Sequence, residues 1–215
     1  MIKVLNLYAG IGGNRKLWPK DIEVTAVEYD EKIVSIYKSN FPNDQVIISD
    51  AHDYLLKNYS EFDFIWSSPP CPTHSGVNNF LHAQGCIRYP AMELWQEIIF
   101  LQHFAKKKNI KWVVENVKSY YPPLWEPQKA GRHYFWSNFE INSFNKKPDF
   151  NTTNMRDTTR KSAKENLKLL KEYYGFNVDN AKYLRNCVHP DLGLHVYNCF
   201  KKSIKAKKQQ LNLFI

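Results

Sequence analysis

The predicted fold is decided by the stretch Asp63-Phe64-Ile65-Trp66-Ser67-Ser68-Pro69-Pro70-Cys71-Pro72-Thr73-His74-Ser75. Its apolar run, residues 62–66, predicts a buried strand, and the proline pair ends that strand because proline lacks an N–H donor and fixes φ. Cys71 is therefore expected in a stiff loop at the carboxyl end of a strand, where open α/β sheets place their chemistry. The alternative is a buried structural cysteine, since free cysteine is among the most buried residue types.

Three apolar runs upstream predict further strands of the same sheet, at residues 2–7, 24–27 and 46–48. A crossover helix is expected at residues 31–40, where apolar side chains recur at helical spacing. The first strand leads into the glycine-rich turn Tyr8-Ala9-Gly10-Ile11-Gly12-Gly13. Glycines permit positive φ and a close approach of the backbone to a ligand. The position of this turn after the first strand favours a cofactor loop over a plain turn.

Acidic residues follow the second and third strands. Glu28 and Tyr29 come after the second strand, and Asp50 and Ala51 come after the third. An acid after the second strand of a doubly wound sheet is the expected partner of a ribose diol, so the pattern predicts a nucleoside site. Asp50 is expected to accept from an adenine amine, with Tyr29 or Tyr8 stacking on the ring. A helix N-cap or a solvated loop end is the alternative for each acid.

Downstream of Cys71, the sequence predicts a lid and a second acidic strand end. Residues 74–89 are a long polar loop, which next to a candidate nucleophile favours a functional lid. The following helix is expected to bury a stripe made of Met92, Trp95, Ile98, Ile99 and Phe104. The next strand, at 111–114, ends in Glu115, and a desolvated carboxyl group there is expected to stay protonated near neutral pH. A sixth strand is expected with Arg132 near its start.

Composition and charge indicate a globular protein with an uneven distribution of basic residues. The 215 residues are 43% hydrophobic and 15% aromatic, which suits one domain and a modest appendage. Residues 1–136 hold 15 Lys+Arg against 14 Asp+Glu, whereas residues 137–215 hold 15 against 7. This contrast predicts a catalytic core followed by a surface for a polyanion such as nucleic acid. A solvated tail is the alternative.

Other sequence features concern location and metals. No apolar stretch approaches the roughly 20 residues of a membrane span, so a cytoplasmic location is expected. The four cysteines lack C-x-x-C spacing and the seven histidines are scattered, which predicts reduced thiols and no metal site. We also expect a monomer.

The order of these motifs resembles that of the cytosine-C5 methyltransferase family over nearly the whole chain. Glu28 looks like the family's ribose acid and Asp50 like its adenine contact, while residues 8–13 look like its cofactor loop. Pro70-Cys71 is similar to its nucleophile loop and Glu115-Asn116-Val117 to its Glu-Asn-Val motif. Asn186 and Val188 are similar to its last motif, which folds back beside the cofactor.

The resemblance implies an α/β, Rossmann-like S-adenosylmethionine-dependent methyltransferase fold, with a doubly wound, mostly parallel sheet and a small basic appended region. The cofactor is then S-adenosyl-L-methionine, and the implied catalytic residues are Cys71, Glu115 and Arg132. The implied cofactor-binding residues are Tyr8, Ala9, Gly10, Ile11, Gly12, Gly13, Glu28, Tyr29, Asp50, Ala51, Pro69, Asn186 and Val188.

The chain departs from the family pattern in three places. Asn6 stands where the family usually has aspartate. If Gln128 begins the family's Gln-x-Arg-x-Arg motif, Arg132 matches the second arginine but Ala130 replaces the first, which is implied to hold the cytosine carbonyl oxygen. The family's long target-recognition region is reduced to residues 139–183, between catalytic segments 1–138 and 184–204. Base contacts carry sequence specificity, so we expect a short or degenerate target site and strong salt dependence.

The resemblance implies a DNA (cytosine-5-)-methyltransferase that acts on double-stranded DNA, of the kind found in restriction-modification. The implied route adds the Cys71 thiolate to C6 of a flipped cytosine while Glu115 protonates or hydrogen-bonds N3. RNA, including transfer RNA, is an alternative substrate. An amino-methyltransferase acting on an exocyclic nitrogen is a second alternative, although Cys71 and Glu115 favour C5 chemistry.

The carboxyl-terminal segment 205–215 is a basic tail that carries a separate motif. Its residues Gln210, Leu211, Leu213 and Phe214 are similar to the peptide by which bacterial replication proteins dock on the sliding clamp. An apolar end packed on its own domain is the alternative. A further alternative is a clamp-bound module without enzymatic activity, with Ala130 as the inactivating change.

Overall fold

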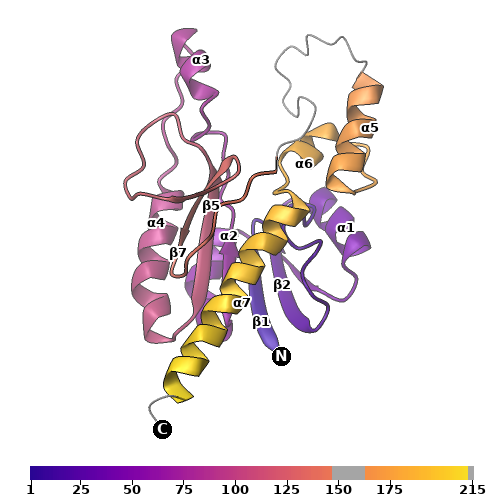
Figure 1. Ribbon diagram of the computed structural model, residues 1–215. Helices are drawn as coiled ribbons and strands as arrows, with labels where there is room; N and C mark the ends of the chain where they lie inside the picture. Colours follow the sequence, from indigo (N-terminus) through magenta and orange to yellow (C-terminus); the bar gives the residue numbers. More distant parts are fainter. Residues whose placement is uncertain (147–162, 213–215) are drawn as a thin grey trace.

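The computed structural model describes the backbone of residues 1–146 and 163–212, with side chains up to residue 205. Within these residues one seven-stranded sheet has the order β3-β2-β1-β4-β5-β7-β6 (Figure 1). Its strands are β1 (Ile2–Leu7), β2 (Ile22–Glu28), β3 (Gln45–Ile48), β4 (Phe64–Ser67), β5 (Lys111–Val117), β6 (Gln128–Ala130) and β7 (His133–Ser137). The helices are α1 (Glu31–Asn40), α2 (Ala51–Asn58), α3 (Asn78–Ala83), α4 (Glu93–Phe100), α5 (Ala163–Tyr174), α6 (Ala181–Arg185) and α7 (Pro190–Asn212). A short 3-10 helix, η1 (Tyr59–Glu61), follows α2, and a short π-helix, η2 (Leu101–Ala105), continues α4.

The sheet confirms the predicted doubly wound, mostly parallel fold. Strands β1 to β5 pair in parallel, and β7 pairs antiparallel with both β5 and β6. The strand order reverses at β1, which lies between β2 and β4. At such a reversal the connections leave in opposite directions, so a crevice opens at the carboxyl ends of the strands.

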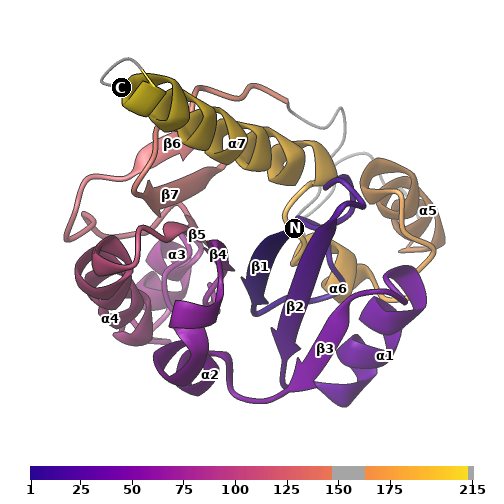
Figure 2. The same ribbon diagram turned by 90° about the horizontal axis from the view of Figure 1, so that it is seen from below.

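Helices cover both faces of the sheet because alternate strand residues are buried on opposite sides. Val4 and Val24 belong to one core with Val196 of α7, whereas Leu5 belongs to a second core with Leu55 of α2. Figure 2 shows α7 along one face and α2 and α4 on the other. With both faces covered, the open position for a ligand is the carboxyl edge.

Residues 163–184, which precede α7, pack on the glycine-rich turn and α1. Leu170 and Tyr174 of α5 share a core with Ile11, and Ile33 and Ile36 of α1 pack against the same core. Figure 1 shows α5 and α6 beside α1. Residues 163–183, expected to be part of a recognition region, therefore also help to build the cofactor side of the catalytic fold. Residues 147–162 of that expected region lie outside the described residues.

The buried stripe predicted for the helix after Pro90 is wrong at three positions. Met92 is 61% exposed, Ile99 52% and Phe104 40%. The buried stripe also includes Leu94 and Leu101, which are about two helical turns apart. They lie on the same face of the helix as Trp95 and Ile98. From Leu101 to Ala105 the helix widens to the π form, which turns Phe104 away from the core.

The loop predicted at residues 74–89 contains one short helix. Helix α3 lies at the carboxyl edge of the sheet (Figure 1), where Asn78 is buried and the His82 ring contacts that of Tyr120. Phe80 of α3 is 58% exposed, and Ile87 and Tyr89 of the following loop are 62% and 81% exposed. The predicted position of the loop beside the sheet edge therefore holds.

The carboxyl-terminal helix α7 continues past residue 204, where the predicted catalytic segment ends, into the predicted basic tail. Its backbone is helical to Asn212, so Gln210 and Leu211 of the clamp-like peptide are in α7. Their side chains, together with Leu213 and Phe214, lie outside the described residues. Across the part of the chain that the structure describes, no helix has the length and apolar character needed to cross a membrane.

Candidate active site

One cavity at the carboxyl edge of the sheet contains both the glycine-rich turn and Cys71. Its walls come from the ends of β1, β2, β4 and β5, from the start of β7, and from the loop between α6 and α7. The lining residues are Tyr8, Gly10, Glu28, Tyr29, Ile33, Ala51, Ser68, Pro69, Pro70, Cys71, Pro72, Glu115, Asn116, Val117, His133, Lys182, Arg185, Asn186, Cys187 and Val188. A cofactor on the glycine turn and a base beside Cys71 would therefore meet in a single space.

The loop that carries Cys71 is held on both sides by amide side chains. Asn116 Nδ2 donates to the carbonyl oxygen of Pro69 at 3.0 Å, and Asn78 Nδ2 donates to that of Pro72 at 2.8 Å. Prolines lack an N–H, so the loop is anchored through its carbonyl oxygens. The Cys71 carbonyl in turn accepts from the backbone of His74 at 3.0 Å. These bonds fix the backbone that presents the thiol.

Glu115 and Cys71 both favour their neutral forms in this cavity. The Glu115 side chain is 7% exposed, and burial raises the pKa of this carboxyl to about 7, against the effect of a hydrogen bond with Ser68. Burial, and then the charge of Glu115, raise the pKa of the Cys71 thiol to about 11. Near neutral pH, Glu115 can therefore hold a proton for donation, as the sequence predicts.

His133, which the sequence analysis did not select, is the basic residue nearest to Glu115. Its Nε2 lies 3.7 Å from Glu115 Oε1, and its side chain lines the cavity. Burial, and then the positive charges of Arg132 and Lys118, lower the pKa of His133 to about 4, so the ring is neutral near pH 7. The signal in the sequence is the position of His133 directly after Arg132. Successive side chains along a strand point to opposite sides, so a strand that turns one of these two positions away from the cavity turns the other toward it.

Arg132, predicted as a catalytic residue, is not among the residues that line the cavity of Cys71 and Glu115. It lies in the tight turn between β6 and β7 and lines a different cavity, together with Tyr173, Tyr174 and His189. The predicted contact of Arg132 with a target base stays a prediction.

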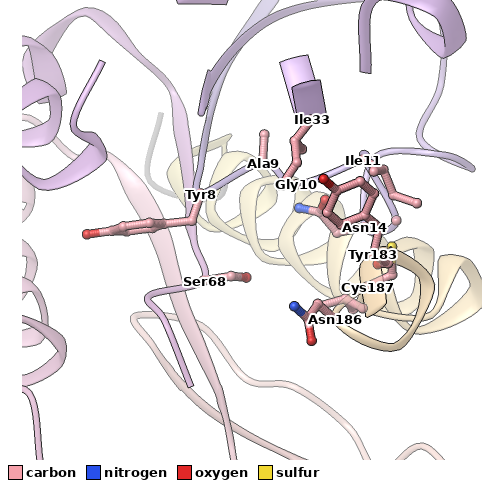
Figure 3. Close-up of a pocket in the computed structure, with 12 residues that line it drawn as sticks. Tyr8, Ala9, Gly10, Ile11, Asn14, Ile33, Ser68, Tyr183, Asn186 and Cys187 are labelled. Carbon is pink, nitrogen blue, oxygen red and sulfur yellow. Dashed lines mark hydrogen bonds between the residues drawn. The ribbon is translucent and has the colours of Figure 1, made fainter. Parts of the chain in front are cut away.

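The glycine-rich turn leaves room for a ligand at Gly10. Gly10 has φ of 55°, and a Cβ there would meet nothing within 4 Å, so its open side faces space. Gly12 and Gly13 serve close packing: a Cβ would lie 2.2 Å from the Phe41 ring at Gly12 and 2.4 Å from the Val188 carbonyl oxygen at Gly13. Close packing of Gly13 brings the loop containing Asn186 and Val188 beside the turn. Figure 3 shows Asn186 and Ser68 extending into the pocket next to Gly10.

Glu28 is held in place by backbone groups while it lines the cavity. Its Oε2 accepts from Gly10 N at 3.0 Å, and its Oε1 accepts from the N–H groups of Tyr29 and Asp30 at 3.0 and 3.2 Å. A fixed carboxylate beside an open glycine matches the polar hydroxyls of a ribose. These residues fit a nucleoside-bearing cofactor, with Glu28 as the group that would hold the ribose.

The other predicted nucleoside contacts differ in placement. Asp50 is exposed and caps α2, where its Oδ1 accepts from Asp53 N at 2.9 Å, so the N-cap alternative describes its present role. Its neighbour Ala51 lines the cavity, as does Tyr29, which is 72% exposed. The Tyr8 ring turns away from the pocket (Figure 3). Tyr29 is therefore the better placed of the two tyrosines to stack on an adenine.

Glu97 of α4 anchors Tyr8, the first residue of the glycine-rich turn, and the sequence analysis did not select it. This residue is fully buried, and its carboxylate accepts from Tyr8 Oη at 2.6 Å and Ser67 Oγ at 2.5 Å. His52 Nδ1 lies 3.2 Å from the same carboxylate, and this hydrogen bond raises the pKa of His52. Tyr8 has positive φ, which is uncommon for a residue with a side chain, and the Glu97 bond ties that conformation to α4. The signal is an acid inside an otherwise apolar helix stripe.

The fold and the site together define an S-adenosylmethionine-dependent methyltransferase. The sheet supplies a nucleoside site at its reversal point, and the same cavity holds a thiol and a carboxyl that can carry a proton. Residues 2–119, more than half of the chain, match the family model of C-5 cytosine-specific DNA methylases, and the chain belongs to this family. The family takes its methyl group from S-adenosylmethionine.

Two animal proteins are similar in sequence to part of the chain. The human tRNA (cytosine(38)-C(5))-methyltransferase is 30% identical over 99 residues, which are 38% of this chain and 25% of that protein. The Bos taurus protein of the same name is 26% identical over 126 residues, 55% of this chain and 31% of that protein. The chain thus spans less than a third of the length of these relatives.

Two solved structures are similar to parts of the chain. A crystal structure of a DNMT2 mutant from Spodoptera frugiperda is 26% identical, with a TM-score of 0.39, over 55% of this chain and 36% of that chain. The Entamoeba histolytica methyltransferase EhMeth is 16% identical, with a TM-score of 0.40, over 68% of this chain and 57% of that chain.

Proposed function

We propose that the protein methylates C5 of a cytosine in double-stranded DNA through a covalent bond between Cys71 and C6 of the base. The observation that supports this most directly is that Cys71 and Glu115 line the same cavity as Gly10 and Glu28. A nucleophile, a proton donor and a nucleoside-cofactor site are the three components that C5 chemistry needs.

The chemistry follows from the weak nucleophilicity of cytosine C5. The Cys71 thiolate adds to C6, and Glu115 gives a proton to N3, so that the electrons of the C5–C6 double bond become available at C5. The cofactor supplies an electrophilic methyl group on a sulfonium. Transfer of the methyl group to C5 leaves a neutral thioether. Loss of the C5 proton to water then reforms the C5–C6 double bond and expels the Cys71 thiolate, and N3 returns its proton to Glu115. Glu115 therefore needs a proton, and Cys71 needs to lose one.

A base stacked in a duplex cannot reach this cavity, so we propose that the enzyme flips it out. Helix α3 and the loop after it lie at the same edge of the sheet as the site and expose the apolar side chains of Phe80, Ile87 and Tyr89. Apolar and aromatic side chains of this kind can fill the space left by a flipped base or stack on its neighbours. The net charge of +9 favours a polyanionic substrate.

A second candidate substrate is transfer RNA, because the two animal relatives are named tRNA (cytosine(38)-C(5))-methyltransferases. The short segment 139–183 supports this candidate as well as DNA, since RNA is often bound through its shape rather than through base edges. The chemistry at Cys71 and Glu115 is the same for both substrates.

The test is methyl transfer from tritiated S-adenosylmethionine to genomic duplex DNA and, separately, to unmodified transfer RNA. The product is digested, and the methylated nucleoside is identified. We expect 5-methylcytosine in DNA as the main product. If 5-methylcytosine forms in transfer RNA alone, the second candidate replaces the first, and a methyl group on an exocyclic nitrogen would contradict both.

A further inference from the structure

If Gln128 begins the family's arginine motif, Ala130 stands where its first arginine would be, and His133 is a side chain that lies beside Glu115. Ala130, at that position, is fully buried in the core between the sheet and α7. Arg132 lines a neighbouring cavity beside α5, which His133 also lines, but it does not line the cavity of Cys71 and Glu115. The cavity wall next to Glu115 is formed instead by His133, the first residue of β7.

Strand pairing places His133 on the same side of the sheet as Glu115. His133 pairs with Val117 of β5, which is two residues beyond Glu115 and so has the same orientation. The distance from His133 Nε2 to Glu115 Oε1 is 3.7 Å, too long for a direct hydrogen bond. The His133 ring and the Glu115 carboxyl group therefore lie side by side, and each can hydrogen-bond to a third group.

The two ring nitrogens of His133 have different surroundings. Nδ1 is enclosed by protein and has no hydrogen-bond partner. A proton on Nδ1 would leave a buried donor unsatisfied, which costs more than a bare lone pair. The neutral ring is therefore expected to carry its proton on Nε2, the nitrogen on the side of Glu115 and the cavity.

We propose that His133 is a base-contacting catalytic residue whose Nε2–H donates to the carbonyl oxygen at C2 of the target cytosine, in place of the missing arginine. This inference rests on the proposed function. The C2 carbonyl oxygen and N3 are adjacent acceptors on one edge of the pyrimidine, so the groups that bind them must be neighbours, as His133 and Glu115 are. When Cys71 adds to C6, negative charge develops on this edge, and a donor positioned there stabilises that charge.

The test compares single-turnover methyl-transfer rates on two synthetic duplexes, one with cytosine and one with 2-thiocytosine at the position that the wild-type enzyme methylates. Sulfur at C2 accepts hydrogen bonds weakly, so it removes the proposed contact from the substrate side. The variants are His133→Ala, His133→Arg and, as a control, the exposed His103→Ala. His133→Phe fills the volume without a donor and replaces His133→Ala if the latter does not fold.

We expect His133→Ala to slow transfer to cytosine on the order of 10-fold, with a much smaller effect on 2-thiocytosine. His133→Arg is expected to recover part of the rate on cytosine, and cofactor affinity is expected to be unchanged in all variants. Equal losses on both duplexes, or no loss on cytosine, would overturn the role of His133 while the proposed function stands. If the wild-type enzyme methylates no cytosine in DNA or RNA, the proposed function fails and this inference with it.

Discussion

The two ends of the cavity are built in different ways. At the base end, three titratable side chains, Cys71, Glu115 and His133, are shifted by burial toward their neutral forms. At the cofactor end, the backbone dominates, with an open Gly10 and with Glu28 held by three N–H groups. At the base end, side chains can gain or lose protons near neutral pH. At the cofactor end, the hydrogen bonds that hold Glu28 are already formed before any ligand binds.

This difference separates chemistry from binding. A preorganised carboxylate such as Glu28 can bind a cofactor without rearrangement, but it has no role in moving protons. A buried carboxyl such as Glu115 is costly to ionise, and this cost is what keeps a proton available near neutral pH. Variants at the base end are therefore expected to change the rate, and variants at the cofactor end are expected to change affinity.

The largest effect is expected for Cys71→Ser. Removal of an enzyme's nucleophile commonly lowers turnover by a factor on the order of 10⁴ or more, and a serine hydroxyl is a much weaker nucleophile at C6. Cofactor affinity, measured by calorimetry, is expected to be unchanged because Gly10 and Glu28 are untouched. The exposed Cys86→Ser is the matched control. Normal turnover in Cys71→Ser would show that Cys71 is not the nucleophile and that the base end does not carry the chemistry.

Glu115→Gln is expected to lower the rate at pH 7 by a factor of about 10² to 10⁴ and to change its pH dependence. In the wild-type enzyme, kcat/KM rises about tenfold per pH unit as Cys71 ionises, and it levels off above pH 7 because Glu115 loses its proton. Glutamine cannot lose that proton, so the variant keeps rising through pH 9. A plateau at the same pH in both enzymes would show that Glu115 does not supply the proton.

The same substitution is expected to stabilise the protein at alkaline pH. The pKa of Glu115 rises from 4.5 unfolded to about 7 folded, so the folded state holds the proton more tightly and stability falls as pH increases across that interval. At pH 8 this loss corresponds to about 3 kcal/mol, which glutamine avoids. Denaturant unfolding at pH 4 and pH 8 measures the difference, with the exposed Glu93→Gln as control. A gain at pH 4 equal to that at pH 8 would exclude ionisation as the cause.

The smallest effect is expected at the cofactor end. Glu28→Gln keeps the shape of the side chain but removes its charge, and we expect the dissociation constant for S-adenosylmethionine to increase about tenfold. The rate at saturating cofactor is expected to stay within about twofold of the wild-type rate. Glu31→Gln, on the exposed start of α1, is the control. A large loss of rate at saturation would mean that the two ends are not separable.

The sequence predicted those parts of the site that depend on local signals and on one rule of topology. Strand ends at Glu28, Cys71 and Glu115 are marked by abrupt changes from apolar to polar residues. Parallel strands bring such ends to one edge of the sheet, so the convergence of Cys71 and Glu115 could be expected before any coordinates. The glycine-rich turn could be located because it follows directly after the first apolar strand.

The remaining parts depend on tertiary geometry. The choice between Arg132 and His133 depends on how the turn between β6 and β7 orients a short antiparallel hairpin, which a single-residue shift reverses. Glu97 could not be assigned because its partners Tyr8, Ser67 and His52 come from three distant segments. The clamp-like peptide at Gln210, Leu211, Leu213 and Phe214 stays a prediction.

The central claim is a covalent bond between Cys71 and C6 of the target base, and the most direct test is to trap that bond. A duplex with 5-fluorocytosine at the methylated position is incubated with the protein and S-adenosylmethionine. Fluorine at C5 cannot leave as a proton does, so the final elimination is blocked. Mass spectrometry of the digested product is expected to locate the oligonucleotide on the peptide that contains Cys71, with no adduct in Cys71→Ser. Methylation of cytosine by the wild-type enzyme without an adduct on 5-fluorocytosine, or with an adduct at another residue, would contradict the claim.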